Sequence, residues 1–196
     1  ADIRAPGMVE RIVPLLRTLH DVGTRKLRGP VLMCWVFHVV RDYAATLMDA
    51  GSPHIAALPG LLDIADRLEA AVGPVEVVLG HNDLLPANLL DAGDRLWLID
   101  GDYGGLNTPL FDLAGLASNA GLAEARERDM LAAYYGHPAD DGLWRRYSAM
   151  KCASLLRETM WSMVSEIHSE IDFDYAAYTA ENRARLDAAL ADFERL

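Results

Sequence analysis

The sequence predicts an α+β fold that is mostly α-helical and contains one small β-hairpin. Long stretches rich in Ala, Leu and Arg repeat apolar residues at helical spacing. One β-branched run, Val75–Leu79, interrupts that pattern near the middle of the chain. The 196 residues are 52% hydrophobic and 24% charged, which suits a globular chain with a sizeable core.

The first part of the chain is predicted to be helical. Apolar spacing indicates a helix that ends before Gly23, and a basic loop is expected over Thr24–Gly29. Pro30 is compatible with the first turn of a second helix, because that turn needs no N–H from it. A third helix follows the loop at Pro53–Pro59 and ends at Gly73. The three expected helices are Met8–His20, Val31–Ala50 and Leu61–Val72.

From Val75 the periodicity changes to that of strands and then returns to that of helices. Two short strands joined by a turn at Ala92–Asp94 predict the small hairpin. Together with the β-branched run, the expected strands are Val75–Leu79, Asn88–Asp91 and Arg95–Asp100. Four more helices are expected at Phe111–Ala120, Ala123–Tyr135, Asp140–His168 and Tyr175–Leu196.

Charge and cysteine content limit the partners and the compartment. A net charge of -11 argues against nucleic acid or an anionic membrane as the main partner and suits a cationic substrate. Cys34 and Cys152 stand apart in apolar surroundings, so reduced thiols and a cytoplasmic location are expected. The apolar run Val31–Val40 is too short to span a bilayer, and no export signal is apparent.

The residues His81–Asn88 and a later strand end at Asp100 supply the parts needed for phosphoryl transfer. Asp83 is placed to accept the proton of a substrate hydroxyl. Asn88 and Asp100 offer a neutral and a charged oxygen to magnesium, while His81 is expected to hold the loop backbone. An ordinary surface turn is the alternative, but a turn requires neither the preceding strand nor an acid at the end of the second one.

The segments His81–Asn88, Leu98–Asn107 and Phe111–Ala114 resemble the choline/ethanolamine kinase branch of the aminoglycoside phosphotransferase superfamily. The resemblance runs from the first helix to the end of the chain. It implies that residues 1–196 form the C-terminal lobe of a protein-kinase-like fold, in which a small β-hairpin carries the catalytic loop.

The same resemblance implies roles for individual residues. Asp83 would be the catalytic base, Asn88 and Asp100 the Mg²⁺ ligands, and Asp102 a further acid at the metal site. Asp112 would brace the catalytic loop, although it could also cap the helix that begins near Phe111.

Two residues of the long C-terminal helices, Glu158 and Trp161, together with Ile171–Tyr175, resemble the region with which this branch holds an ammonium group. Cation–π attraction is the physical basis for such a role. Trp161 could equally be a core aromatic, and Glu158 could be a solvated residue that stands where choline kinases commonly carry a second Trp. The acceptor therefore stays open between choline or ethanolamine, an aminoglycoside and a thiamine-like alcohol.

The part of a kinase that grips the nucleotide is not recognisable in the chain. There is no G-x-G-x-x-G pattern, and the two lysines, Lys26 and Lys151, both lie in or between helices. We therefore expect an ATP- and Mg²⁺-dependent small-molecule kinase in its complete form, with this chain alone inactive for want of the N-terminal nucleotide-gripping lobe. The alternative is a non-catalytic, single-lobe binding module.

Overall fold

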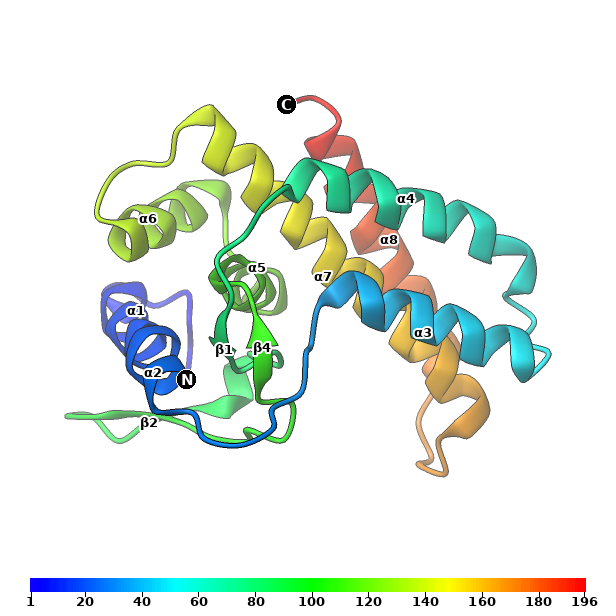
Figure 1. Cartoon of the computed structure of the whole chain (residues 1–196), viewed down its shortest axis with the longest axis horizontal. Helices are drawn as coiled ribbons and strands as arrows, with labels where there is room; N and C mark the ends of the chain where they lie inside the picture. The colour runs from blue at the N-terminus through cyan, green and yellow to red at the C-terminus, as the bar shows by residue number, and fades with distance from the viewer.

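The longest helix, α7 (Asp141–His168), is the central element of the computed structural model, which describes residues 1–196 (Figure 1). It packs against α5 (Pro109–Ala120), against α8 (Tyr175–Phe193) and against the pair formed by α3 (Val36–Asp49) and α4 (Leu58–Val72). These contacts join 41 buried hydrophobic residues into one core. Burial of this shared apolar surface holds the helices together.

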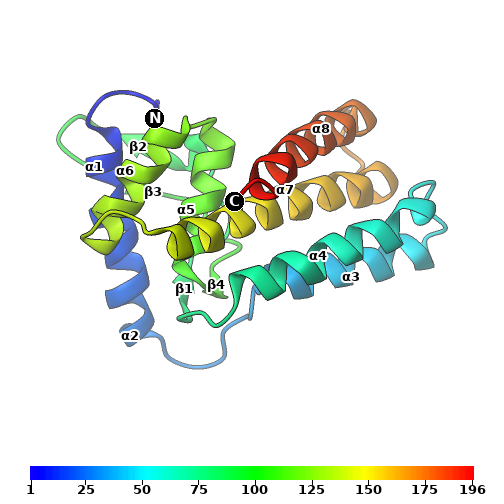
Figure 2. The ribbon, with the colours of Figure 1, turned by 90° about the horizontal axis from the view of Figure 1, so that it is seen from above.

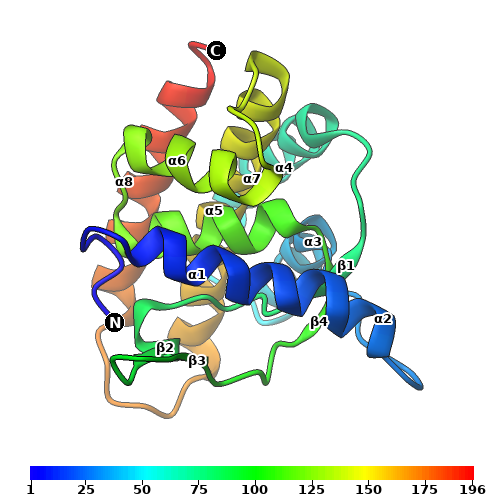
Figure 3. The same cartoon turned by 90° about the vertical axis from the view of Figure 1, so that its left-hand side faces the viewer.

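Two groups of helices lie on either side of this centre. Figure 2 shows α3 and α4 running alongside α7 and α8. At the other end of the molecule, α1 (Met8–Arg17) packs against α6 (Glu124–Tyr135). Figure 3 shows α5 behind α1, with the β-hairpin below them. The mostly helical α+β fold class is confirmed. None of the helices combines the length and the hydropathy that a membrane-spanning segment requires.

The strands form two antiparallel pairs. Strand β2 (Leu89–Asp91) pairs with β3 (Leu96–Leu98), with Leu89 opposite Leu98, so the predicted hairpin is confirmed. Strand β1 (Val78–Gly80) pairs instead with β4 (Gly105–Asn107). The sequence did not predict β4, because its glycines are typical of turns.

A close approach of two segments, Leu32–Cys34 and β4, explains the glycine at the start of β4. A Cβ atom at Gly105 would lie 2.6 Å from Cys34 Sγ and 2.8 Å from the carbonyl oxygen of Leu32. Only glycine leaves room for that contact. Gly105 therefore permits β4 to form, and the same glycine made the sequence of this segment typical of a turn.

The predicted start of the second helix, at Val31, was wrong. Helix α3 begins at Val36, and the segment before it is extended beside β4. Leu106 N–H donates to the Leu32 carbonyl at 2.7 Å, and Cys34 N–H donates to the Leu106 carbonyl at 2.8 Å. The continuous apolar run in this region fits a strand period as well as a helical one, so periodicity alone misplaced the boundary.

The predicted loop at Thr24–Gly29 was also partly wrong. A π-helical turn over Thr18–Gly23 follows α1, and α2 (Thr24–Lys26) continues it. The wide turn places His20 in the interior with no exposed surface. Thr24 Oγ1 accepts a hydrogen bond from the Leu79 N–H of β1 at 2.7 Å. This segment thus contacts the strand that leads into the loop His81–Asn88.

The other helices lie within a few residues of their predicted bounds. Helix α4 starts at Leu58, earlier than expected, after a 3₁₀ turn at Ile55–Ala57 in the predicted loop. Its end at Val72 and the course of α5 to α8 agree with the sequence. Asp140 and Asp174 cap α7 and α8 by accepting the N–H groups of Leu143 and Ala177.

Candidate functional site

The candidate catalytic loop connects β1 to β2 and closes on itself. Asn88 Nδ2 donates to the backbone carbonyl of Asp83 at 3.0 Å, and Leu85 N–H donates to the same oxygen at 3.0 Å. A 3₁₀ turn over Pro86–Asn88 then leads directly into β2. Pro86 starts this turn because its fixed φ suits a first helical position. The Asp83 side chain remains 20% exposed, so it stays open to a ligand.

Asn82 fixes the backbone beside Asp83. Its φ of 67° is left-handed, a conformation that asparagine tolerates better than most residues. Its Nδ2 donates to the Tyr103 and Gly105 carbonyls at 2.9 and 3.2 Å, while its Oδ1 accepts from Asn107 Nδ2 at 2.9 Å. The sequence analysis assigned no role to Asn82 or to Asn107. Here the two amides connect the loop to β4.

Asp112 lies behind the loop and is 1% exposed. Its Oδ2 accepts the His81 N–H at 2.7 Å and its Oδ1 accepts the Asn82 N–H at 2.8 Å. His20 Nε2 lies 3.0 Å from Oδ2, and His20 Nδ1 lies 2.7 Å from the hydroxyl of Tyr134. The capping position of α5 is Thr108, where no side-chain cap is formed. Asp112 therefore bonds to the loop rather than to the start of its own helix.

His81 occupies the interior side of the loop. Its Nε2 lies 2.9 Å from the carbonyl oxygen of Ile99, which precedes Asp100 at the end of the hairpin. Because a carbonyl oxygen only accepts, Nε2 carries the proton in this contact. The bond connects the two segments that carry Asp83 and Asp100.

The hairpin places the backbone of Asn88 beside Ile99, the residue before Asp100. The Ile99 N–H donates to the Asn88 carbonyl at 3.0 Å, so the residue after β3 lies beside the residue before β2. Asn88 uses its Nδ2 within the loop, which leaves its Oδ1 without a hydrogen bond. Asp100 is exposed with a φ of 63°, and its carboxylate makes no hydrogen bond or ion pair. Asp102 is also exposed and unpaired, on the turn that precedes β4.

A pocket of about 530 Å³ opens beside Asp83. Its walls come from the candidate catalytic loop, from the turn before β4, from α7, and from α8 with the segment that leads into it. The lining residues are Asp83, Leu85, Tyr103, Arg157, Glu158, Trp161, Ile171, Asp172, Phe173, Tyr175 and Tyr178. The structure thus brings Glu158 and Trp161, both singled out in the sequence, to the same pocket as Asp83.

Four aromatic rings form a closed cycle at the outer end of this pocket. Trp161 lies 6.0 Å from Tyr175 and 6.4 Å from Tyr178, measured between ring centroids. Phe173 lies 5.0 Å from Tyr175 and 5.7 Å from Tyr178. Neighbouring planes are inclined by 67° to 90°. Such edge-to-face contacts stabilise aromatic clusters and present π faces and edges in a fixed arrangement.

Charged groups gather at the inner end of the pocket. Arg157 Nη1 lies 3.2 Å from Glu158 Oε2 and 3.8 Å from Asp83 Oδ1, and its guanidinium carbon lies 5.4 Å from the Tyr103 ring centroid. Burial raises the pKa of Asp83 above its ordinary value. The positive charge of Arg157 opposes that shift, whereas the negative charges of Glu158 and Asp100 add to it. A carboxylate with a raised pKa is a stronger base for a hydroxyl proton.

Arg157 and Tyr178 were missed in the sequence. An arginine in a long helix is typical of a solvated face, and Tyr178 comes from a different helix, 20 residues after its hydrogen-bond partner Glu158. Only the packing of α7 against α8 places these side chains together. His20 was missed for the same reason, because it lies 92 residues from Asp112 in the chain.

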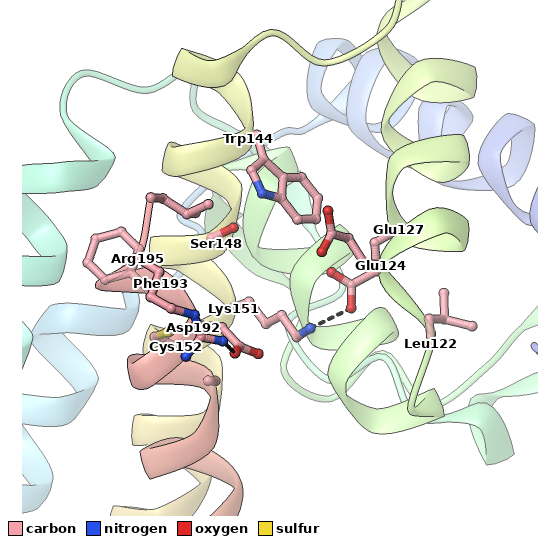
Figure 4. A pocket seen from close by; sticks show the side chains of 12 residues that line it. Leu122, Glu124, Glu127, Trp144, Ser148, Lys151, Cys152, Asp192, Phe193 and Arg195 are labelled. Carbon is pink, nitrogen blue, oxygen red and sulfur yellow. Dashed lines mark hydrogen bonds and ion pairs between the residues drawn. The ribbon is translucent and has the colours of Figure 1, made fainter.

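A second cavity, of about 390 Å³, lies among α6, α7 and α8 and contains none of the predicted site residues (Figure 4). Lys151 points across it to Glu127, which is 2% exposed. Trp144 and Phe193 lie on its walls. Every charged group drawn near its centre already has a partner of opposite sign, so the arrangement is that of a structural ion-pair region.

Comparison with known proteins relates this chain to phosphotransferases. The model of the phosphotransferase enzyme family matches residues 2–150. Protein LicA of Haemophilus influenzae is 35% identical over 129 residues, which make up 62% of this chain and 46% of LicA. The chain thus spans about half the length of that curated relative.

Solved structures extend the likeness over nearly the whole chain. A choline/ethanolamine kinase family protein from Mesorhizobium loti superposes with a TM-score of 0.84 at 26% identity, covering 97% of this chain and 65% of that one. A crystal structure of LicA in complex with AMP gives a TM-score of 0.69 at 23% identity, covering 94% and 62%. The kinase-like fold expected from the sequence is confirmed by these superpositions.

Proposed function

The chain belongs to the phosphotransferase enzyme family, and from this we propose that it supplies the acceptor and metal-binding part of an ATP- and Mg²⁺-dependent kinase that phosphorylates a small amino alcohol. One observation carries the proposal: Asp83 lies at the inner end of a pocket with aromatic walls, beside the hairpin that presents Asn88 and Asp100. The similarity to a choline/ethanolamine kinase family protein supports the acceptor class.

Asp83 acts as the general base in this proposal. The acceptor hydroxyl donates its proton to the Asp83 carboxylate while its oxygen bonds to the γ-phosphorus of ATP, and the bond from that phosphorus to ADP breaks. Burial supports the role, since it raises the pKa of Asp83. The bonds from Asp112 to the His81 and Asn82 N–H groups fix the loop on which Asp83 is carried.

Asn88 and Asp100 would hold Mg²⁺. Their free amide oxygen and free carboxylate fit an ion that takes one or two carboxylates from the protein and completes its shell with phosphates and water. No group of three or more His, Cys, Asp or Glu side chains is arranged to hold a metal ion, so the proposed site would take few ligands from the protein. When bound, Mg²⁺ would neutralise charge on the phosphates. Asp102, exposed two residues further on, is proposed as an additional acid of this site.

ATP is proposed as the donor because the chain belongs to this family and because LicA, a protein of the same fold, binds AMP. The nucleotide-gripping lobe expected from the sequence analysis is part of this proposal for the complete protein. A single-lobe binding module is the competing account, and it predicts acceptor binding without phosphoryl transfer.

The acceptor is proposed to carry a positive charge. Trp161 and Tyr178 offer π faces and edges at one end of the pocket, and cation–π attraction adds about 0.5–2 kcal/mol for a well-placed ring. Glu158 contributes a negative charge between these rings and Asp83. The net charge of -11 favours the approach of a cation through the general field of the protein.

The proposal is tested by ADP release from the full-length gene product with a panel of alcohols. The panel contains ethanolamine, choline, 3-aminopropanol, thiamine and streptomycin, each with and without Mg²⁺. Mg²⁺-dependent ADP release with a small amino alcohol, and detection of its phosphate ester, are expected. ADP release with only thiamine or streptomycin would show that the proposed acceptor class is wrong. Binding of an acceptor without formation of any phosphate ester would favour the binding module.

A further inference from the structure

Glu158 is held by two neighbours in the acceptor pocket. The Tyr178 hydroxyl donates to its Oε1 at 2.8 Å, and Arg157 Nη1 donates to its Oε2 at 3.2 Å. The Arg157 side chain is 11% exposed and the Glu158 side chain 20% exposed. Two charge-assisted hydrogen bonds in this partly buried pocket fix the direction of the Glu158 carboxylate, which would otherwise rotate freely. Glu158 is therefore oriented before any acceptor binds.

The oriented carboxylate still has hydrogen-bonding capacity. An ionised carboxylate offers about four acceptor positions, and Arg157 and Tyr178 use two of them. Glu158 lines the pocket beside Asp83, so a ligand bound there can donate a hydrogen bond to the remaining positions. A ligand that covers Glu158 without donating a hydrogen bond would exclude water from these positions and leave them unpaired, which is unfavourable.

A short amino alcohol can contact Asp83 and Glu158 at the same time. Because Arg157 Nη1 is 3.8 Å from Asp83 Oδ1 and 3.2 Å from Glu158 Oε2, these two carboxylate oxygens are at most about 7 Å apart. Two hydrogen bonds of about 2.8 Å each, joined by a two-carbon amino alcohol, can span that distance. The hydroxyl can therefore meet Asp83 while the ammonium group meets Glu158.

The aromatic rings and Glu158 recognise different properties of the cation. Trp161 and its neighbours attract any cation, whether or not it carries N–H groups, because the attraction is to the ring quadrupole. Glu158 is satisfied only by a group that donates a hydrogen bond. A primary, secondary or tertiary ammonium has at least one N–H to give, and a quaternary ammonium has none.

We infer that Arg157, Glu158 and Tyr178 together form a selectivity element that favours acceptors whose ammonium group carries N–H over quaternary ammonium acceptors. This inference rests on the proposed function, because it assumes that an amino alcohol occupies the pocket. Glu158 touches the acceptor, whereas Arg157 and Tyr178 act through Glu158 as positioning residues. Loss of a hydrogen bond to a charged group predicts discrimination on the order of 10- to 100-fold.

The test measures kcat/KM of the full-length protein with ethanolamine, its N-methyl and N,N-dimethyl derivatives, and choline. The largest fall is expected at the last methylation, which removes the only remaining N–H. This series needs no variant, so it remains decisive even if a substituted protein fails to fold. Choline used as well as, or better than, the dimethyl derivative would overturn the inference.

Three variants test which residues cause the preference for acceptors whose ammonium group carries N–H. Glu158→Gln, which removes the charge at nearly constant shape, is expected to reduce the preference for the dimethyl derivative over choline to within about threefold. Tyr178→Phe should reduce it partly, through KM rather than kcat. Glu181→Gln, at an exposed acid of α8 outside the pocket, is the matched control and should leave the ratio unchanged. A ratio that survives Glu158→Gln intact would overturn the inference.

The two proposals fail in different ways. If the amino alcohols are phosphorylated but choline is used as well as the others, the selectivity is wrong and the kinase function stands. If no amino alcohol is phosphorylated by the wild-type protein, the proposed acceptor class is wrong and the selectivity falls with it.

Discussion

Replacement of Asp112 by Asn distinguishes a loop brace from a helix cap. Asparagine keeps the volume of the side chain and is as good an N-cap as aspartate, so a residue that merely caps α5 would tolerate the change almost without cost. In the structure, however, both oxygens of Asp112 accept hydrogen bonds from buried groups. Only one of the two oxygens remains an acceptor in the amide.

The expected loss of unfolding free energy in Asp112→Asn follows from these contacts. With the amide oxygen in the place of Oδ2, the His81 N–H and His20 keep an acceptor, while the NH₂ group faces the Asn82 N–H. The Asn82 N–H and the NH₂ group that faces it are then both unpaired, at about 1–3 kcal/mol for each buried donor, and the other bonds lose their charge-assisted part. We expect a total loss of about 3 kcal/mol, which is a large fraction of a typical domain stability of about 5–15 kcal/mol.

The assay is urea unfolding, with the free energy taken from the midpoint at constant slope. Asp174→Asn is the matched control, since Asp174 caps α8 by accepting the Ala177 N–H and is replaced by an equivalent cap. The control should change stability by less than about 0.5 kcal/mol. An Asp112→Asn protein as stable as this control would refute the bracing role.

Three further outcomes follow from the site and its surroundings. Asn88→Ala and Asp100→Ala should each raise the Mg²⁺ concentration that gives half-maximal turnover, or abolish turnover, through the loss of a metal oxygen. Trp161→Leu should raise KM for a cationic acceptor about 2- to 30-fold, from the loss of about 0.5–2 kcal/mol of cation–π attraction, with kcat less affected. The hydrogen bond from Arg11 lowers the pKa of Asp91 to about 2, so its stabilising contribution is present above the unfolded value of about 4 and is lost as the pH falls towards 2. Unfolding midpoints measured between these pH values should therefore fall further for the wild type than for Asp91→Asn.

The course of the loop that carries Asp83 could be predicted from the sequence because its parts are local. The hairpin brings Asn88 beside the end of β3, and a short connection of four residues, 92–95, sets that register. The spacing of Asp83, Asn88 and Asp100 therefore carries geometric information by itself. The long amphipathic helices were predictable for a similar reason, since their periodicity is set by burial on one face.

The support of the loop could not be predicted in the same way. His20 contacts Asp112 and Tyr134 across 92 and 114 residues of sequence, and no local pattern relates residues so far apart. In the helical pattern Arg157 is typical of a solvated residue, and only the packing of α7 against the loop that carries Asp83 places it in the site. Strand β4 was hidden because the close contact at Gly105 requires a residue that is typical of turns.

The central claim is that Asp83 takes the proton of an acceptor hydroxyl during phosphoryl transfer. The most direct measurement is the rate at which the full-length protein and its Asp83→Asn variant transfer labelled γ-phosphate from ATP to ethanolamine. Equal unfolding midpoints of the two proteins are the control for folding. We predict that the substitution lowers the transfer rate on the order of 10²- to 10⁴-fold. An Asp83→Asn protein that transfers phosphate at the wild-type rate would contradict the claim.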